Sequence, residues 1–305
     1  MEPTAPAAMS PRTEATRGLL ALVTAFTIWG VLPLYIRLLQ HVPPVQITAH
    51  RLIFCCVFVL GFLRARGAQA ELWAALRAPR ERYRLIASSL LIATNWLVFV
   101  WAVNDGRVVE ASLGYFINPM LNVVLGVIVL REHLRVQQWL AVVLAGSGVV
   151  YLTWLSGAPP WIALVLATTF SSYGLLRKTV AVDAMAGLGA ETLLLTPIAL
   201  AYLAYCESQR SGAMRAGDPI TGFLLVFSGA LTALPLWSFA YGARRIAYST
   251  VGILQFIGPT ISLVIGVALF HEPFPLARAI GFAFIWAGLA VYAVDGVLRR
   301  QRELR

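Results

Sequence analysis

Charged residues and cysteines are both scarce in this chain. Asp, Glu, Lys and Arg make up 12% of its 305 residues, while 59% are hydrophobic. That charged fraction is about half of what soluble domains carry. The three cysteines, of which Cys55 and Cys56 are adjacent, lack the spacing of a disulfide framework or a metal site. The composition therefore excludes an ordinary soluble globule and predicts a polytopic membrane protein.

Lysine is almost absent, because 23 of the 24 basic residues are arginine and the one lysine is Lys178. The net charge of +10 does not indicate nucleic-acid binding, since most arginines lie between apolar segments. Eighteen basic residues fall on one predicted side of the membrane and four on the other. Cytoplasmic loops carry such an excess, so both termini are predicted to be cytoplasmic.

Ten apolar segments follow one another, each close to the length that spans about 30 Å of hydrocarbon. They cover residues 18–40, 44–63, 85–103, 110–130, 138–155, 160–177, 188–206, 221–241, 249–270 and 276–298. We predict an all-α protein with ten transmembrane helices. Residues 1–17 are expected to form a disordered cytoplasmic tail and 299–305 a basic one. The basic loop 64–84 is either solvated or contains an amphipathic helix through Leu72, Trp73 and Leu76.

The two halves of the chain align when the sequence is shifted by 140 residues. Phe116, Ile117, Pro119, Gly126, Glu132 and Gly148 fall on Phe256, Ile257, Pro259, Gly266, Glu272 and Gly288. Five helices per half is an odd number, so the second half must enter the membrane in the opposite orientation. An inverted repeat of residues 18–155 and 156–298 is typical of secondary transporters.

A stripe of polar and small residues marks the segment 110–130. Glu110, Gly114, Asn118, Asn122 and Gly126 recur every four residues and share one helix face. Such a face either lines a wet cavity or packs closely against a neighbouring helix. We favour the cavity wall for the stripe as a whole, while both interpretations stay open for each asparagine.

Several motifs resemble those of a known family. They are FTIWG at 26–30, His50-Arg51, NWLVFVWAVN at 95–104, EASLGYFINP at 110–119, QFIGPT at 255–260 and FAFIW at 282–286. They resemble the drug/metabolite transporter superfamily with its paired EamA domains, and more closely the RarD family, named for a link to chloramphenicol sensitivity. Ala49 and Phe256 stand where that family often has Thr and Tyr. The resemblance implies ten-helix carriers of the cytoplasmic membrane with a central cavity.

The residues predicted to contact a solute are polar or aromatic side chains within the apolar segments. They are Asn95, Trp96, Tyr115, Asn118, Asn122, Tyr173, Trp237, Tyr241 and Gln255. Taken singly, Tyr115, Tyr173, Trp237 and Tyr241 are better explained by packing, because aromatic residues are common in such helices. Trp96 and Trp101 point apart on their helix, so one of the two is expected to face the cavity.

Four ionisable residues inside or at the ends of segments are candidates for coupling or charge recognition. Glu191 is the first candidate for proton coupling and Glu110 the second, although Glu110 also suits a helix N-terminus. His50 is either titratable or structural. Arg51 neutralises an anionic solute group or extends to the outer surface.

The sequence therefore favours a secondary carrier, an exporter of a small organic solute that works by alternating access. We expect no cofactor, no metal and no nucleic-acid partner, and the oligomeric state is open. A channel and a non-transporting membrane scaffold or sensor are the alternatives. A membrane enzyme is disfavoured because the chain has no HExxH, GxSxG or Walker motif.

Overall fold

The computed structural model describes residues 11–130, 136–180, 182–216, 218–243, 245 and 254–303. Within these ranges the secondary structure is entirely helical. The helices are α1 (Pro11–Leu38), α2 (Pro44–Ala65), α3 (Gln69–Arg77), α4 (Pro79–Asn104), α5 (Val108–Leu130), α6 (Val136–Ser156), α7 (Trp161–Thr179), α8 (Ala184–Ser208), α9 (Pro219–Ala243), α11 (Ile257–Val264) and α12 (Leu276–Glu303), with a 3-10 turn η1 (Ala213–Ala216) and a π turn η2 (Ile265–Leu269).

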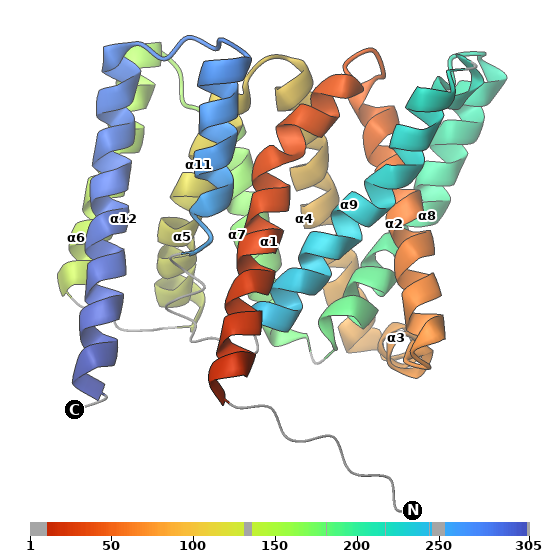
Figure 1. Ribbon diagram of the computed structural model, residues 1–305, viewed down its shortest axis with the longest axis horizontal. Coiled ribbons are helices and arrows are strands. Elements are labelled where there is room, and N and C mark those ends of the chain that lie inside the picture. The colour runs from red at the N-terminus through yellow and green to blue at the C-terminus, as the bar shows by residue number, and fades with distance from the viewer. Residues whose placement is uncertain are drawn as a thin grey trace, which may run out of the picture.

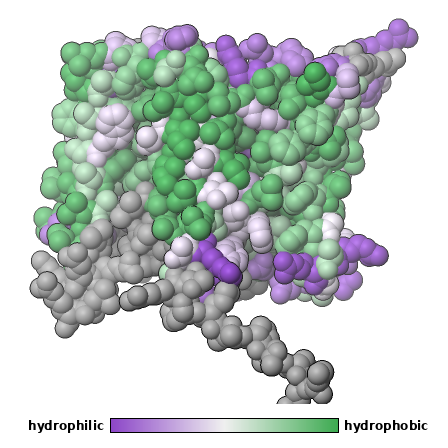
Figure 2. All heavy atoms as spheres, viewed as in Figure 1, coloured by the Kyte–Doolittle hydropathy of each residue, from purple (hydrophilic) through white to green (hydrophobic). Residues whose placement is uncertain are grey.

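Seven of the described helices are long and apolar enough to cross a membrane, which confirms a polytopic all-helical protein. They are Glu14–Leu38, Pro44–Ala65, Pro79–Asn104, Val136–Leu155, Ala184–Ser208, Pro219–Phe239 and Leu276–Asp295. Figure 2 shows a broad apolar belt between two hydrophilic ends. α5 and α7 cover two further predicted segments, and α11 with η2 covers part of 249–270, of which 249–253 lie outside the described residues. The number ten stays a prediction.

The helices begin and end at two opposite ends of the molecule (Figure 1). α1 begins and α12 ends at the same end, which also carries α3, and we call this the termini end. The end at which α1 stops and α2 starts is the distal end. α1 begins at Pro11, so the tail predicted for residues 1–17 is helical from residue 11, with Glu14 in a first turn that favours a carboxylate. α12 likewise continues to Glu303, into the predicted basic tail.

The basic loop does contain a helix, α3, but its apolar face packs against protein. Leu72 is 1% exposed and joins a core cluster with Leu63 and Leu188. Trp73 is exposed. α3 therefore covers the termini end of α2 and α8 and leaves Trp73 as the apolar side chain directed away from them.

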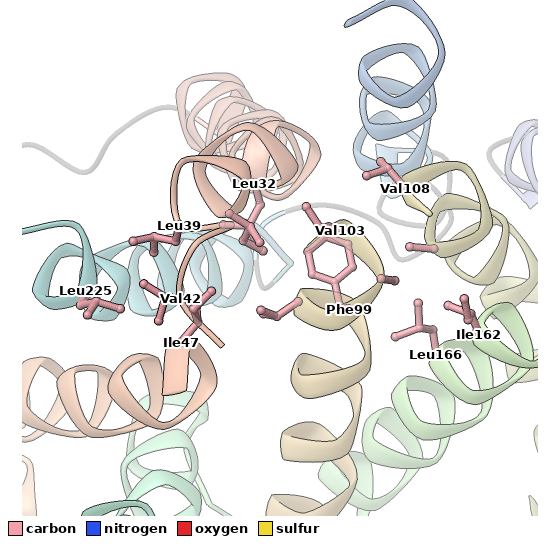
Figure 3. Close-up of a cluster of buried hydrophobic side chains, with 14 residues drawn as sticks. Leu32, Leu39, Val42, Ile47, Phe99, Val103, Val108, Ile162, Leu166 and Leu225 are labelled. Carbon is pink, nitrogen blue, oxygen red and sulfur yellow. The ribbon is translucent and has the colours of Figure 1, made fainter. Parts of the chain in front are cut away.

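Two groups of helices differ in how deeply they are buried. α2, α4 and α8 have about half of their residues buried, whereas α6 and α12 pack on each other at one edge and are mostly exposed. Gly148 allows that edge pair to approach closely, because a Cβ there would lie 2.7 Å from the backbone oxygen of Gly281. Figure 3 shows the core cluster at the distal end, where Leu32, Leu39 and Val42 meet Phe99, Val103 and Val108.

Candidate functional site

Glu191 is the centre of a buried polar group near the termini end. Its side chain is 1% exposed and accepts hydrogen bonds from Ser88 Oγ at 2.6 Å and Tyr173 Oη at 3.2 Å. Arg177 Nη1 lies 3.7 Å from Glu191 Oε1, and Gly187 leaves room for the guanidinium, because a Cβ would lie 1.9 Å from that nitrogen. Helices α4, α7 and α8 therefore meet at one carboxylate.

Arg51 is the second buried charge and lies in the distal half of α2. The residue is 5% exposed, and its Nε donates to Thr232 Oγ1 on α9 at 2.6 Å. Its guanidinium carbon lies 4.8 Å from the centre of the Trp96 ring on α4, a distance at which a cation is attracted to the ring face. Among the described residues no carboxylate lies within ion-pair distance of Arg51. Extension to the surface does not occur, since this side chain turns into the helix bundle.

Asn95, next to Trp96, is buried and ties three helices together. Its Nδ2 donates to Leu166 O and Thr169 Oγ1, both at 3.0 Å, and its Oδ1 accepts from Tyr115 Oη at 3.1 Å. The amide therefore positions α5 and α7 against α4. In this conformation its donors and acceptor already have protein partners, and its role as a solute ligand stays a prediction.

The polar stripe of α5 faces more than one environment. A Cβ on Gly114 would lie 2.8 Å from Ala163 O of α7, so the two backbones are in close contact. Asn118 is 5% exposed and its Oδ1 accepts from Ser171 Oγ of the same neighbour. Asn122 is exposed. At Gly114 and Asn118 the stripe therefore packs against α7, which is the alternative that we did not favour for the stripe as a whole. At these two residues it does not face the outer surface of the bundle.

The remaining predicted site residues lie apart from one another, except for Trp237 and Tyr241. His50 is buried, with Nδ1 2.8 Å from Gln46 O, and because a carbonyl only accepts, Nδ1 carries the proton. Trp237 is 39% exposed and packs against Phe62 and Tyr241 near the termini end of α9. Gln255 is half-buried in the turn before α11, and Glu110 is half-buried in the first turn of α5. Of the predicted set, the structure brings together Arg51 with Trp96, Asn95 with Tyr115, Tyr173 with Glu191, and Trp237 with Tyr241.

Side-chain hydrogen bonds join the helices at the distal end. Both oxygens of Glu272 accept from the start of α5, from Val108 N at 2.6 Å and Val109 N at 2.8 Å. His41 Nε2 lies 2.8 Å from Thr221 Oγ1 at the start of α9. Gln46 donates to Ser211 O at 2.9 Å and accepts from Ala213 N at 2.8 Å. These contacts join the segment after η2 to α5, the segment after α1 to α9, and the start of α2 to the segment after α8.

Sequence reasoning missed several residues of these groups as site residues, including Ser88, Arg177, Thr232 and Glu272. Arg177 was counted only as a loop charge. Ser88 and Glu272 were visible as members of the 140-residue alignment, paired with Ser228 and Glu132. A matched polar residue in two apolar halves was the available signal, but it does not say what the residue touches.

Comparison with known proteins places the chain in a family. Residues 16–154 match the EamA-like transporter family. An uncharacterized transporter of Pseudomonas aeruginosa is 43% identical, with 92% of this chain and 94% of that protein covered. Protein RarD of Escherichia coli is 38% identical, with 95% and 98% covered, and an uncharacterized transporter of Bacillus subtilis is 42% identical, with 93% and 96% covered.

One solved crystal structure has the same fold. It superposes with a TM-score of 0.60 at 22% sequence identity and covers 94% of this chain and 99% of its own. At that identity the likeness concerns the fold alone. The identities to RarD and its relatives extend over nearly the full chain, and the described helices form an apolar belt of membrane-spanning length. The protein therefore belongs to the EamA-like transporter family and is a multi-pass membrane transporter related to the RarD proteins.

Proposed function

We propose that the protein is a secondary transporter that exports a small organic solute across the cytoplasmic membrane by alternating access. Two inverted halves of five helices each, residues 18–155 and 156–298, would exchange access to a site between them. The termini end would face the cytoplasm, because the bias of eighteen basic residues to four favours it.

The observation that carries this proposal is the positional match between the helices of the two halves. α8, α9 and α12 begin 140 residues after α2, α4 and α6. That is the same offset at which the two halves of the sequence align. Three long helices sharing one offset support a structural repeat, since insertions in any loop would break the match.

The packing of the helices supports the same interpretation. Under the 140-residue offset α1 corresponds to α7, α4 to α9, and α5 to α11. The contact of α1 with α9 then corresponds to that of α7 with α4, and the contact of α1 with α11 to that of α7 with α5; all four are observed. α1 ends at the distal end, and α7 begins there. Trp161, the first residue of α7, lies 5.4 Å ring centre to ring centre from Trp101, which is in the last turn of α4 at the distal end. Opposite directions are what an inverted repeat requires.

The contacts at the distal end support a state closed on that side. Glu272 bridges the segment after η2 to the start of α5, so the two proposed halves are held together there by a pair of hydrogen bonds. Opening toward the outside would require these bonds to break. Glu191, at the other end, is the proposed coupling group, because a carboxyl buried in a membrane protein can bind and release a proton. Ser88, Tyr173 and Arg177 are placed to stabilise its ionised form.

The test is solute movement into proteoliposomes without ATP. A thermal-shift screen of the purified protein against metabolites and antibiotics identifies a binding solute first, because a ligand of the folded state raises the unfolding temperature. Its transport is then followed under an imposed pH gradient in wild type, Glu191→Gln and Glu110→Gln, with the exposed Glu71→Gln as control. We expect loss of gradient-driven transport in Glu191→Gln.

Undiminished transport in both Glu191→Gln and Glu110→Gln would remove these carboxylates from the coupling mechanism. A flux that never saturates with solute concentration would indicate a channel, and the absence of any flux would indicate a scaffold or sensor.

A further inference from the structure

Arg51 has more hydrogen-bonding capacity than the protein uses. A guanidinium has five N–H donors, and among the described residues one hydrogen bond is formed, from Nε to Thr232. Arg51 lies seven residues after the start of α2 at Pro44, about 10 Å into the helix at 1.5 Å per residue. The two terminal nitrogens, which form the planar fork that binds carboxylates, have no partner among the described residues.

Within the part of the chain that the structure describes, no carboxylate pairs with Arg51. The ionisable side chains that interact with it are Cys55, Tyr35 and Tyr115, which are neutral at physiological pH. Glu191 is paired with Arg177 instead. A buried cation without a counterion is costly in a membrane protein and usually marks a functional site.

The guanidinium is also held in a fixed position. Thr232 on α9 fixes Nε from one side, and the Trp96 ring on α4 supports the guanidinium carbon at 4.8 Å. Asn95, beside Trp96, is fixed by α7 and α5. Side chains of α9 and α4 therefore orient the fork before any ligand arrives, and α5 and α7 hold the neighbouring Asn95. Such preorganisation lowers the cost of binding.

We propose that Arg51 binds the anionic group of the transported solute, and that the solute is an organic monoanion, a carboxylate with an aromatic or apolar body. This inference rests on the proposed transport function and adds the class of substrate to it. The fork matches a carboxylate in two parallel hydrogen bonds.

The charge of the site indicates a monoanion. Arg51 brings a single positive charge, and the described groups that interact with it, Cys55, Tyr115 and Tyr35, include no second cation. A phosphate monoester carries nearly two negative charges. Arg51 would neutralise one of them, and about one negative charge would stay uncompensated inside the bundle.

Aromatic rings next to the site indicate the body of the solute. Tyr115 lies 6.0 Å from Phe170, ring centre to ring centre, and Phe170 lies 6.2 Å from Tyr173. All three rings are partly accessible, and they lead from the neighbourhood of Asn95 toward Glu191. An apolar body would lie along these rings while its carboxylate binds Arg51.

The experiment compares matched acids and amides on the purified full-length protein. The probes are indole-3-acetate, phenylacetate and benzoate, each against its carboxamide, with tryptamine as a cation. Binding is measured by thermal shift and by titration calorimetry on wild type, Arg51→Gln and Arg51→Lys. Arg37→Gln is the control, because Arg37 also lies over an aromatic ring, 5.2 Å from the centre of Phe270, but at the distal end of α1.

We expect at least one acid to bind wild type about tenfold or more tightly than its amide, and Arg51→Gln to abolish that difference. Arg51→Lys, which keeps the charge without the fork, should bind the acid with intermediate affinity. Arg37→Gln should bind like wild type. Without ligand, Arg51→Gln should unfold at the same temperature as wild type or higher, because no protein counterion is left unpaired.

Three outcomes would overturn the assignment: amides or tryptamine binding as tightly as the acids, Arg51→Gln retaining acid binding, or no acid of the panel binding at all. Transport of the best probe in proteoliposomes separates this proposal from the previous one. An amide that is transported as fast as its acid refutes the anion and leaves the carrier intact. An acid that binds through Arg51 but is never transported refutes the carrier and leaves the site.

Discussion

Replacing Glu272 by alanine should loosen the distal end of the molecule. The side chain gives one oxygen to Val108 N and the other to Val109 N, and both valines are buried, at 0% and 1% exposure. Alanine leaves two donors of the α5 N-terminus without an acceptor. Loss of an N-terminal cap costs about 0.5–2 kcal/mol, and a buried unsatisfied donor about 1–3 kcal/mol. We take about 2 kcal/mol for the pair, which corresponds to about a 30-fold increase in the open population.

The assay is the labelling rate of a single buried cysteine. Val103 is fully buried in the cluster that also contains Val108 (Figure 3), and Val103→Cys is a small change in volume. It is introduced after the three native cysteines, Cys55, Cys56 and Cys206, have been replaced. A maleimide reacts only when the cluster opens, so in the fast-reclosing regime its rate follows the open population.

Glu272→Ala should therefore label on the order of ten to thirty times faster than its parent. Glu71→Ala is the matched control, since Glu71 is exposed on α3 at the termini end and should leave the rate unchanged. A rate for Glu272→Ala within about twofold of the parent would show that the cap does not hold the distal end closed.

Three further outcomes follow from the structure. Gly148→Leu should destabilise the protein by about 1–3 kcal/mol by separating α6 from α12, whereas Gly146→Leu, with no atom within 4 Å of its Cβ, should unfold at the wild-type temperature in detergent. Asn118→Leu should lower folded yield because it removes the side-chain oxygen that accepts from the buried Ser171 hydroxyl and leaves that hydroxyl only the longer bond to the backbone oxygen of residue 118. Equal yields for Asn118→Leu and the exposed Asn122→Leu would contradict that reasoning. The side chain of Thr221 and the backbone amide of Ile220 hold the pKa of Asp218 below its usual range. The cap at the start of α9 should thus persist below the ordinary Asp pKa and be lost as pH falls through the depressed one, seen as faster exchange of the capped amides.

Helix positions could be predicted because hydrophobic length and proline placement are local properties. Pro44 begins α2 as predicted, a position where proline fits a helix start. Pro79 likewise begins α4, six residues before the predicted start at residue 85. The segments 44–63 and 188–206 were predicted within a few residues of α2 and α8. The start of α1 was missed because residues 11–17 are polar, and hydropathy does not register a helix that extends beyond the membrane.

The neighbours of each polar residue could not be predicted from the sequence. The four-residue period put Gly114 and Asn118 on one face, but a period cannot distinguish water from a helix on that face. The neighbour on that face is α7, and its Ser171 hydroxyl donates a hydrogen bond to Asn118. In a wet cavity a water molecule would have been the donor. Contacts between residues far apart in the chain, such as Ser88 with Glu191, depend on how helices cross, which single-sequence patterns do not encode.

Arg51 and Glu191 occupy equivalent positions in the 140-residue alignment. Among the described residues only Glu191 has a counterion. Arg177 lies within 3.7 Å of Glu191. The residue equivalent to Arg177 is Arg37, which packs over the Phe270 ring. An arginine near the centre of a membrane helix costs about 2.5–3.5 kcal/mol. A bound anion would offset this free-energy cost at Arg51 and so stabilise the site. This asymmetry between two otherwise matched halves is the physical reason to look for the substrate among anions.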